Sequence, residues 1–135
     1  MTNPRSKPRT SATFQAAGPK WSTMNGSHRN HYAHQALQNQ WRDTALAFAH
    51  PLFQVRGQVA SPVVITATVH RVRNGRADAH NVTPTIKACI DGAVRAGLLV
   101  DDSDEHVTEL RIRAGEKRPQ PTVTLLIEHA EAVAS

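Results

Sequence analysis

The sequence has a single cysteine, Cys89, among its 135 residues. One thiol cannot form an internal disulfide, and a zinc module built from several cysteines is excluded as well. A chain of this kind suits a reducing compartment. We therefore expect a cytoplasmic protein.

Long apolar runs are also missing. No stretch approaches the roughly 20 apolar residues that a membrane-spanning helix requires. The first 20 residues lack the apolar centre of a secretion signal. We expect no membrane partner.

Acidic residues are absent from the first 42 positions, which contain six basic residues. The whole chain has 16 Lys and Arg against 11 Asp and Glu, which gives a formal net charge of +5. This balance favours an anionic partner, and nucleic acid is the first candidate. The alternative for the N-terminal segment is a basic arm that is merely solvated.

The length of the chain suits one domain with a substantial core. Residues 1–20 are rich in Pro, Ser, Thr, Arg and Lys and have few apolar side chains to bury, which predicts a disordered basic tail. The domain is expected over residues 21–128, with a short C-terminal tail over residues 129–135.

Apolar side chains recur at helical spacing in two segments. The first predicted helix covers residues 29–50 and should end at Pro51. The second should have Thr83 as its N-cap, Pro84 as its first residue and Gly97 after its end.

Residues 63–69 form a β-branched run that is typical of a central strand. Two more strand-like runs cover residues 107–113 and 122–128, and we interpret them as a hairpin. The order helix, strand, helix, strand, strand predicts an α/β fold of the α+β type. A single mixed sheet would have the helices packed on it.

Aspartates flank the second predicted helix. Asp78 lies shortly before it, and Asp101 and Asp102 follow it. Hard divalent cations take oxygen ligands, and phosphodiester hydrolysis is accelerated when a metal activates water and neutralises the leaving oxygen. The alternative is that these aspartates cap turns or lie in a solvated loop.

The sequence around these aspartates resembles the signature of the RusA-like family of Holliday junction resolvases. The agreeing segments are Asp78-Ala79-His80-Asn81, Pro84-Thr85-Ile86-Lys87, Ile90-Asp91-Gly92, Ala96-Gly97-Leu98-Leu99 and Asp101-Asp102-Ser103. Weaker agreement extends the resemblance over about residues 21–128, at Asn25, His31-Tyr32 and Trp41-Arg42.

The resemblance implies a homodimeric endonuclease that resolves Holliday junctions and other branched DNA by paired nicks, in DNA recombination and repair. It implies Mg²⁺, or Mn²⁺, as the cofactor. The implied catalytic residues are Asp78, Asp102 and Lys87, and Asp78 and Asp102 would hold the metal. Family members are frequent in phages, so a phage or prophage origin is expected.

One position departs from the family, because His80 stands where the second metal-binding aspartate is expected. Imidazole is a poorer ligand for Mg²⁺ than a carboxylate, although it serves Mn²⁺ better. Asp101 or Asp91 could complete the site, or His80 could act as a ligand or general base. Asp91 could instead form an ion-pair ladder with Lys87 and Arg95.

The alternative function is a junction-binding protein that has lost cleavage through the change at His80. A third possibility is a general basic nucleic-acid-binding domain with a chance resemblance, which predicts no preference for junctions. Trp41 lies on the apolar stripe and is expected in the core, whereas Trp21 could stack on an unpaired base.

Arg71, Arg73 and Arg76 precede Asp78 and could hold DNA phosphates beside the metal. Further candidates for DNA contacts come from positions that match the family and from the predicted hairpin. Two of them, Lys117 and Arg118, belong to a basic set on the predicted hairpin, for which a solvated hairpin is the alternative. The candidates are Arg71, Arg73, Arg76, Asn81, His31, Arg42, Lys117 and Arg118.

Overall fold

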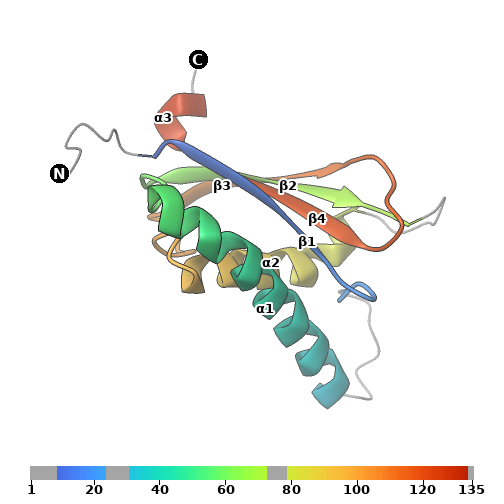
Figure 1. Cartoon of the computed structure of the whole chain (residues 1–135). Coiled ribbons are helices and arrows are strands. Elements are labelled where there is room, and N and C mark those ends of the chain that lie inside the picture. Colours follow the sequence, from blue (N-terminus) through green and yellow to red (C-terminus); the bar gives the residue numbers. More distant parts are fainter. Residues whose placement is uncertain (1–8, 24–30, 73–78, 134–135) are drawn as a thin grey trace.

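The computed structural model describes residues 9–23, 31–72 and 79–133. Two main helices lie on one side of a four-stranded sheet (Figure 1). The elements in chain order are β1 (Ser11–Ala17), α1 (His31–Arg56), β2 (Val63–His70), the 3-10 helix η1 (Ala79–Val82), α2 (Thr83–Arg95), β3 (Val107–Ala114), β4 (Thr122–His129) and α3 (Ala130–Val133).

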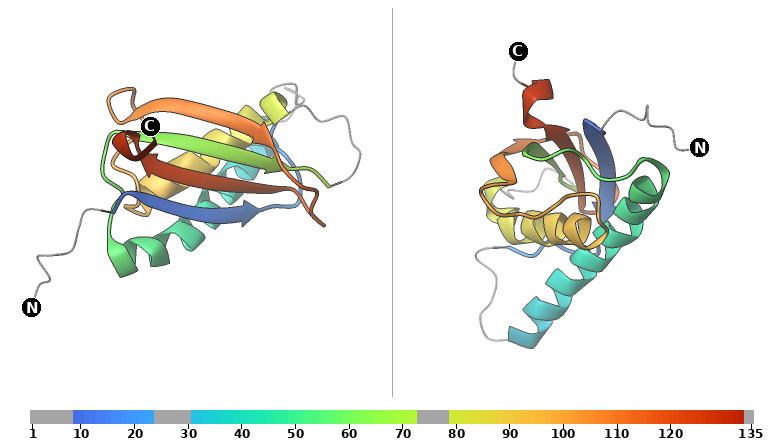
Figure 2. Two further views of the ribbon diagram at one scale, coloured as in Figure 1. Left: turned by 90° about the horizontal axis from the view of Figure 1, so that it is seen from above. Right: turned by 90° about the vertical axis from the view of Figure 1, so that its left-hand side faces the viewer.

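The sheet is mixed, with the strand order β1-β4-β2-β3. Strand β4 runs antiparallel to both of its neighbours, whereas β2 and β3 are parallel. The left view of Figure 2 shows the four strands side by side, with α1 and α2 beneath them. The predicted α+β class, a mixed sheet with helices packed on it, is confirmed.

The core lies between this sheet and the two helices. Alternate residues of β2, from Val63 to Val69, are fully buried, as expected for a central strand. Cys89 of α2 is buried with them, and burial raises the pKa of its thiol to about 12. The thiol therefore stays protonated and unreactive at neutral pH.

Residues 11–17 belong to the sheet, so the predicted N-terminal tail is wrong for this part of the chain. Ala12, Phe14 and Ala16 are buried, and the residues between them are exposed. This alternation is the period of a strand with one covered face. The predicted C-terminal tail is wrong as well, since β4 continues to His129 and α3 follows it.

The predicted hairpin of β3 and β4 is wrong, because β2 lies between these two strands. The connection instead passes along the end of β2, where the Gly115 amide donates to the Val69 carbonyl at 2.9 Å and the Arg118 amide to the Arg71 carbonyl at 3.0 Å. A Cβ on Gly115 would lie 2.4 Å from a Thr68 methyl carbon, so this close passage requires glycine.

Helix α1 continues past Pro51 to Arg56, so its predicted end at His50 is wrong. Proline removes one helical hydrogen bond, but Leu52 packs against the core in the following turn. The helix ends before Gly57, which has a φ of 78° and donates its amide to the Phe53 carbonyl at 2.7 Å. Packing therefore outweighs the local signal of the proline.

Helix α2 was predicted well from its sequence. Gly97 follows the helix with a φ of 89°, as expected for a glycine that ends a helix. The N-cap is Val82, so Thr83 is the first helical residue and Pro84 the second. The predicted start is therefore shifted by one residue.

The helices α1 and α2 cross at Gly92. A Cβ there would lie 2.4 Å from the Arg42 carbonyl oxygen and 2.9 Å from the Leu46 backbone nitrogen. Gly92→Ala is therefore expected to lower the free energy of unfolding by about 1–3 kcal/mol, the usual cost of overpacking. Urea denaturation followed by circular dichroism measures this change.

Alanine is intrinsically favoured over glycine in a helix by about 1 kcal/mol. A Gly92→Ala protein that is as stable as the wild type, or more stable, would therefore contradict a tight crossing of α1 and α2.

Candidate functional site

A pocket of about 370 Å³ lies between α2 and the edge strand β3. We call it the acidic pocket, because three of its lining residues carry carboxyl groups. Its polar lining consists of Lys87 from α2, Asp102 and Asp104 from the loop after α2, and Thr108 and Glu109 from β3.

The acidic pocket unites two of the predicted catalytic residues, Lys87 and Asp102. Helix α2 has 13 residues, so at 1.5 Å per residue it is about 20 Å long and separates the segments at its two ends. The loop over residues 96–106 places Asp102 against the same pocket as Lys87. A turn closes this loop, since the amides of His106 and Val107 donate to the Ser103 carbonyl at 2.9 and 2.8 Å.

The carboxyl groups of the pocket are accessible to solvent. Asp102, Asp104 and Glu109 are all exposed. A hydrogen bond of 2.8 Å from Arg111 lowers the pKa of Glu109, so this carboxylate is ionised at neutral pH. Three carboxyl groups and a threonine hydroxyl are oxygen donors of the kind that Mg²⁺ and Mn²⁺ prefer.

Lys87 supplies the basic group of the acidic pocket. Its side chain is exposed. Among the residues that the structure describes, no carboxylate lies within ion-pair distance of it. Asp91 pairs instead with Arg95, at 3.1 Å. This half of the predicted ion-pair ladder is confirmed, and Lys87 remains available to an anion.

The other predicted metal ligands are placed only in part. Asp101 is exposed in the loop after α2 but does not line the acidic pocket. Asp78 and the side chain of His80 lie outside the described residues, although the backbone of His80 belongs to η1, directly before α2. Within the described part of the chain, no three His, Cys, Asp or Glu side chains converge closely enough to hold one ion.

The predicted DNA contacts fall into separate regions. Arg42 of α1 lines a polar pocket together with Lys87. Asn81 is half-buried in η1, directly before α2, and Arg71 follows β2. Arg73, Arg76 and the side chain of His31 lie outside the described residues.

Lys117 and Arg118 lie on the connection between β3 and β4 rather than on a hairpin. Arg118 donates to the Gln15 side chain at 3.2 Å and pairs with Glu116 at 3.1 Å. It therefore lies near β1, on the sheet edge opposite to the acidic pocket.

Trp41 is 1% exposed, which confirms its predicted place in the core. Trp21 stacks on it with ring centroids 5.6 Å apart and planes 4° from parallel. Because one face of the Trp21 ring already packs on Trp41, this ring contributes to the fold, and the prediction that it stacks on a base has no support.

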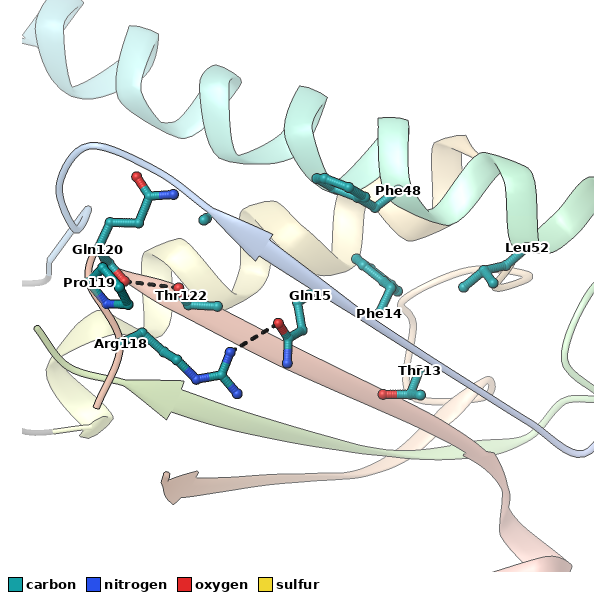
Figure 3. A pocket seen from close by; sticks show the side chains of 10 residues that line it. Thr13, Phe14, Gln15, Phe48, Leu52, Arg118, Pro119, Gln120 and Thr122 are labelled. Atoms are coloured by element: carbon teal, nitrogen blue, oxygen red, sulfur yellow. Dashed lines mark hydrogen bonds between the residues drawn. The ribbon is translucent and has the colours of Figure 1, made fainter. Parts of the chain in front are cut away.

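A second groove, of about 650 Å³, follows the edge strand β1 (Figure 3). Phe14, Phe48 and Leu52 give it an apolar side, and Arg118 and Gln120 lie across the strand from them. No motif or spacing in the sequence predicts this groove. It contains no carboxyl group and lies on the opposite sheet edge from Asp102.

The motifs did not indicate that Asp104, Thr108 and Glu109 line the same pocket as Lys87. Asp104 lies two residues after Asp102 in the same loop, but Thr108 and Glu109 line the pocket only because β3 is the edge strand beside α2. That placement depends on the order of the strands in the sheet. The prediction of a hairpin gave an incorrect order, because it placed β3 next to β4.

No protein-family model matches the chain, and a search of curated proteins finds no match. Within residues 9–23, 31–72 and 79–133, no helix is both long and apolar enough to cross a membrane. The acidic pocket and the motifs that contribute to it are therefore the grounds on which a function can be proposed.

Proposed function

We propose that this protein is a divalent-metal-dependent endonuclease that resolves Holliday junctions and related branched DNA by paired nicks. One observation carries the proposal: Lys87, inside α2, and Asp102, in the loop after it, are both indicated by the motif pattern, and they line one pocket. If the resemblance to the family arose by chance, nothing would require Lys87 and Asp102 to line the same pocket. If both residues serve one reaction, they must lie close together.

In this proposal Asp102 and Asp78 hold the cation, with Asp104 and Glu109 as neighbouring acidic groups. A bound Mg²⁺ or Mn²⁺ supplies an activated water and neutralises charge that develops on the phosphate. Lys87 binds a phosphate oxygen and stabilises the negative charge on it, because its ammonium group has no carboxylate partner among the described residues.

The partners follow from the same proposal. A two-fold junction is matched by a two-fold protein, so a homodimer would supply one acidic pocket to each nicked strand. A cytoplasmic location, where bacterial and phage DNA recombine, suits this activity.

Cleavage of a synthetic four-way junction, compared with a linear duplex of the same sequence, tests the proposal in Mg²⁺ and in Mn²⁺. We expect symmetrical nicks near the crossover of the junction and none in the duplex. Equal cutting of both substrates would contradict junction resolution. No cutting of the junction with either metal would contradict the nuclease function itself.

His80 favours a second candidate function, a junction-binding protein that does not cleave. His80→Asp is expected to raise cleavage in Mg²⁺ by roughly tenfold or more, the usual effect of a change beside a metal. The gain in Mn²⁺ should be smaller, since imidazole is a better ligand for that ion. Rates of junction cleavage in the two metals measure the effect.

The matched control is His80→Asn, which has the shape of aspartate without its charge. It should give no gain in Mg²⁺. Equal rates for the two variants would contradict a metal-binding role at this position. A wild type that binds the junction without cutting it, and that His80→Asp converts to a nuclease, would establish the second function.

A further inference from the structure

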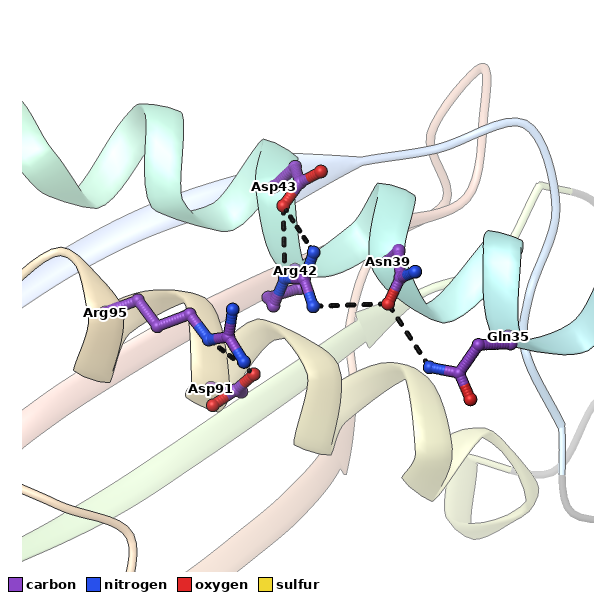
Figure 4. A network of polar contacts seen from close by, with 6 residues as sticks. All are labelled: Gln35, Asn39, Arg42, Asp43, Asp91 and Arg95. Carbon is purple, nitrogen blue, oxygen red and sulfur yellow. Dashed lines mark hydrogen bonds and ion pairs between the residues drawn. The ribbon is translucent and has the colours of Figure 1, made fainter.

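A second polar pocket, of about 300 Å³, lies between α1 and α2. Figure 4 shows the polar contacts among several side chains of these two helices. It adjoins the acidic pocket, because Lys87 lines both. We call it the basic pocket. The lining side chains that matter here are Gln35, Asn39, Arg42, Lys87, Asp91 and Arg95.

The two pockets have opposite charge. The acidic pocket has three carboxyl groups and one amine. The basic pocket has Arg42, Lys87 and Arg95 against one carboxyl group, that of Asp91. The surface charge therefore changes sign at Lys87. The acidic pocket on one side of this residue suits a cation, and the basic pocket on the other side suits an anion.

The donors of the basic pocket are held in place by one another. Gln35 Nε2 and Arg42 Nη1 both donate to Asn39 Oδ1, at 3.3 and 3.2 Å. Arg42 also donates to Asp43 through Nε and Nη2, at 3.0 Å each. The two bonds accepted by the Asn39 oxygen orient its amide group. The amide nitrogen can then act as a donor toward a ligand.

The existing ion pairs are weak enough to yield to a phosphate. In the Asp91–Arg95 pair the two side chains are 42% and 53% exposed, and exposed pairs contribute little to stability. Arginine binds phosphate through two parallel N–H bonds, which are stronger than a solvated pair with a carboxylate. A DNA phosphate can therefore compete for Arg95. The pair of Arg42 with Asp43 is also open to solvent, with side chains 23% and 67% exposed, so a phosphate can compete with the Asp43 carboxylate for Arg42.

We propose that the basic pocket binds the phosphodiester next to the one that is cut, so that the strand passes over Lys87 from one pocket to the other. The identity of the strand rests on the proposed nuclease function, whereas phosphate binding does not require cleavage. In this arrangement Lys87 faces both phosphates, and Arg42 fixes the register of the strand.

The test is the salt dependence of binding to a fluorescent four-way junction, measured by anisotropy in EDTA so that no strand is cut. Loss of one phosphate contact lowers the slope of log K against log salt concentration by about 1. We expect this decrease for Arg42→Gln, together with a roughly tenfold weaker affinity at about 0.1 M salt.

Arg56→Gln is the matched control. Arg56 lies on the same helix, is exposed and lines neither pocket, so its loss removes the same charge without the contact. It should keep the wild-type slope. Arg42→Lys retains the charge and should keep most of the slope, and thermal unfolding checks that each variant is folded.

The outcomes separate this inference from the nuclease function. Equal slopes for Arg42→Gln and Arg56→Gln would overturn the basic pocket even if the wild type cleaves junctions. A lower slope for Arg42→Gln alone would support the pocket even if no cleavage is found. A wild type that shows no salt-dependent binding to DNA would overturn the basic pocket, and cleavage of the junction in Mg²⁺ or Mn²⁺ would still decide the nuclease function.

Discussion

Asp102→Asn is expected to reduce cleavage of a four-way junction by at least about a hundredfold, while the variant still binds the junction. Asp102 lines the acidic pocket with Lys87. The amide has the size of the carboxylate but lacks the charge that a divalent cation requires. Single-turnover cleavage rates and binding affinity, measured on the same protein, test both halves of the expectation.

Glu105→Gln is the matched control for this experiment. Glu105 lies in the same acidic loop, is exposed and does not line the pocket. Its loss should leave the cleavage rate close to that of the wild type. Similar losses in both variants would mean that the charge of the loop, rather than a carboxylate at Asp102, supports cleavage.

The local signals of the sequence located α2, which forms one wall of the acidic pocket, and β2, which pairs with the strand that forms the other wall. Helix α2 was predicted from its apolar spacing and from Gly97, and β2 from its β-branched run. Each signal lies within the element that it specifies. Lys87 and Asp102 could therefore be placed at α2 and in the loop after it without knowledge of the sheet.

The rest of the pocket depended on contacts between distant segments. Thr108 and Glu109 lie beside Lys87 because β3 pairs in parallel with β2 and forms the sheet edge. The sequence of residues 107–113 does not determine which strand they pair with. A strand run that is followed by a second one suggests a hairpin, but the connection over residues 115–121 is long enough to pass the end of β2.

Two local signals also gave wrong predictions because packing opposed them. Strand β1 contains one large apolar residue, Phe14, which is enough for a strand that covers one edge of the core. Pro51 predicts a helix end, yet Leu52 continues α1 by packing against the core. In both places the deciding contacts come from partners far away in the sequence.

Trp41→Ala is expected to lower the free energy of unfolding by about 3–5 kcal/mol, the usual cost of removing a buried tryptophan. Trp41 stacks on Trp21, and its indole nitrogen donates to the Lys20 carbonyl at 2.9 Å. It also fills the space over Gly18, where a Cβ would lie 2.8 Å from the ring. Chemical denaturation followed by circular dichroism measures the loss.

Trp21→Ala provides the comparison, because this ring is only partly buried and stacks on the same partner. It should cost clearly less than Trp41→Ala. A domain of this size has a total stability of about 5–15 kcal/mol, so the Trp41 variant would lose a large share of it. Since Arg42 is the next residue along α1, the variant should also bind DNA more weakly if the basic pocket depends on the packing of this helix. Equal losses for the two variants would mean that the contact between the two rings, and not the deeper burial of Trp41, accounts for the loss of stability.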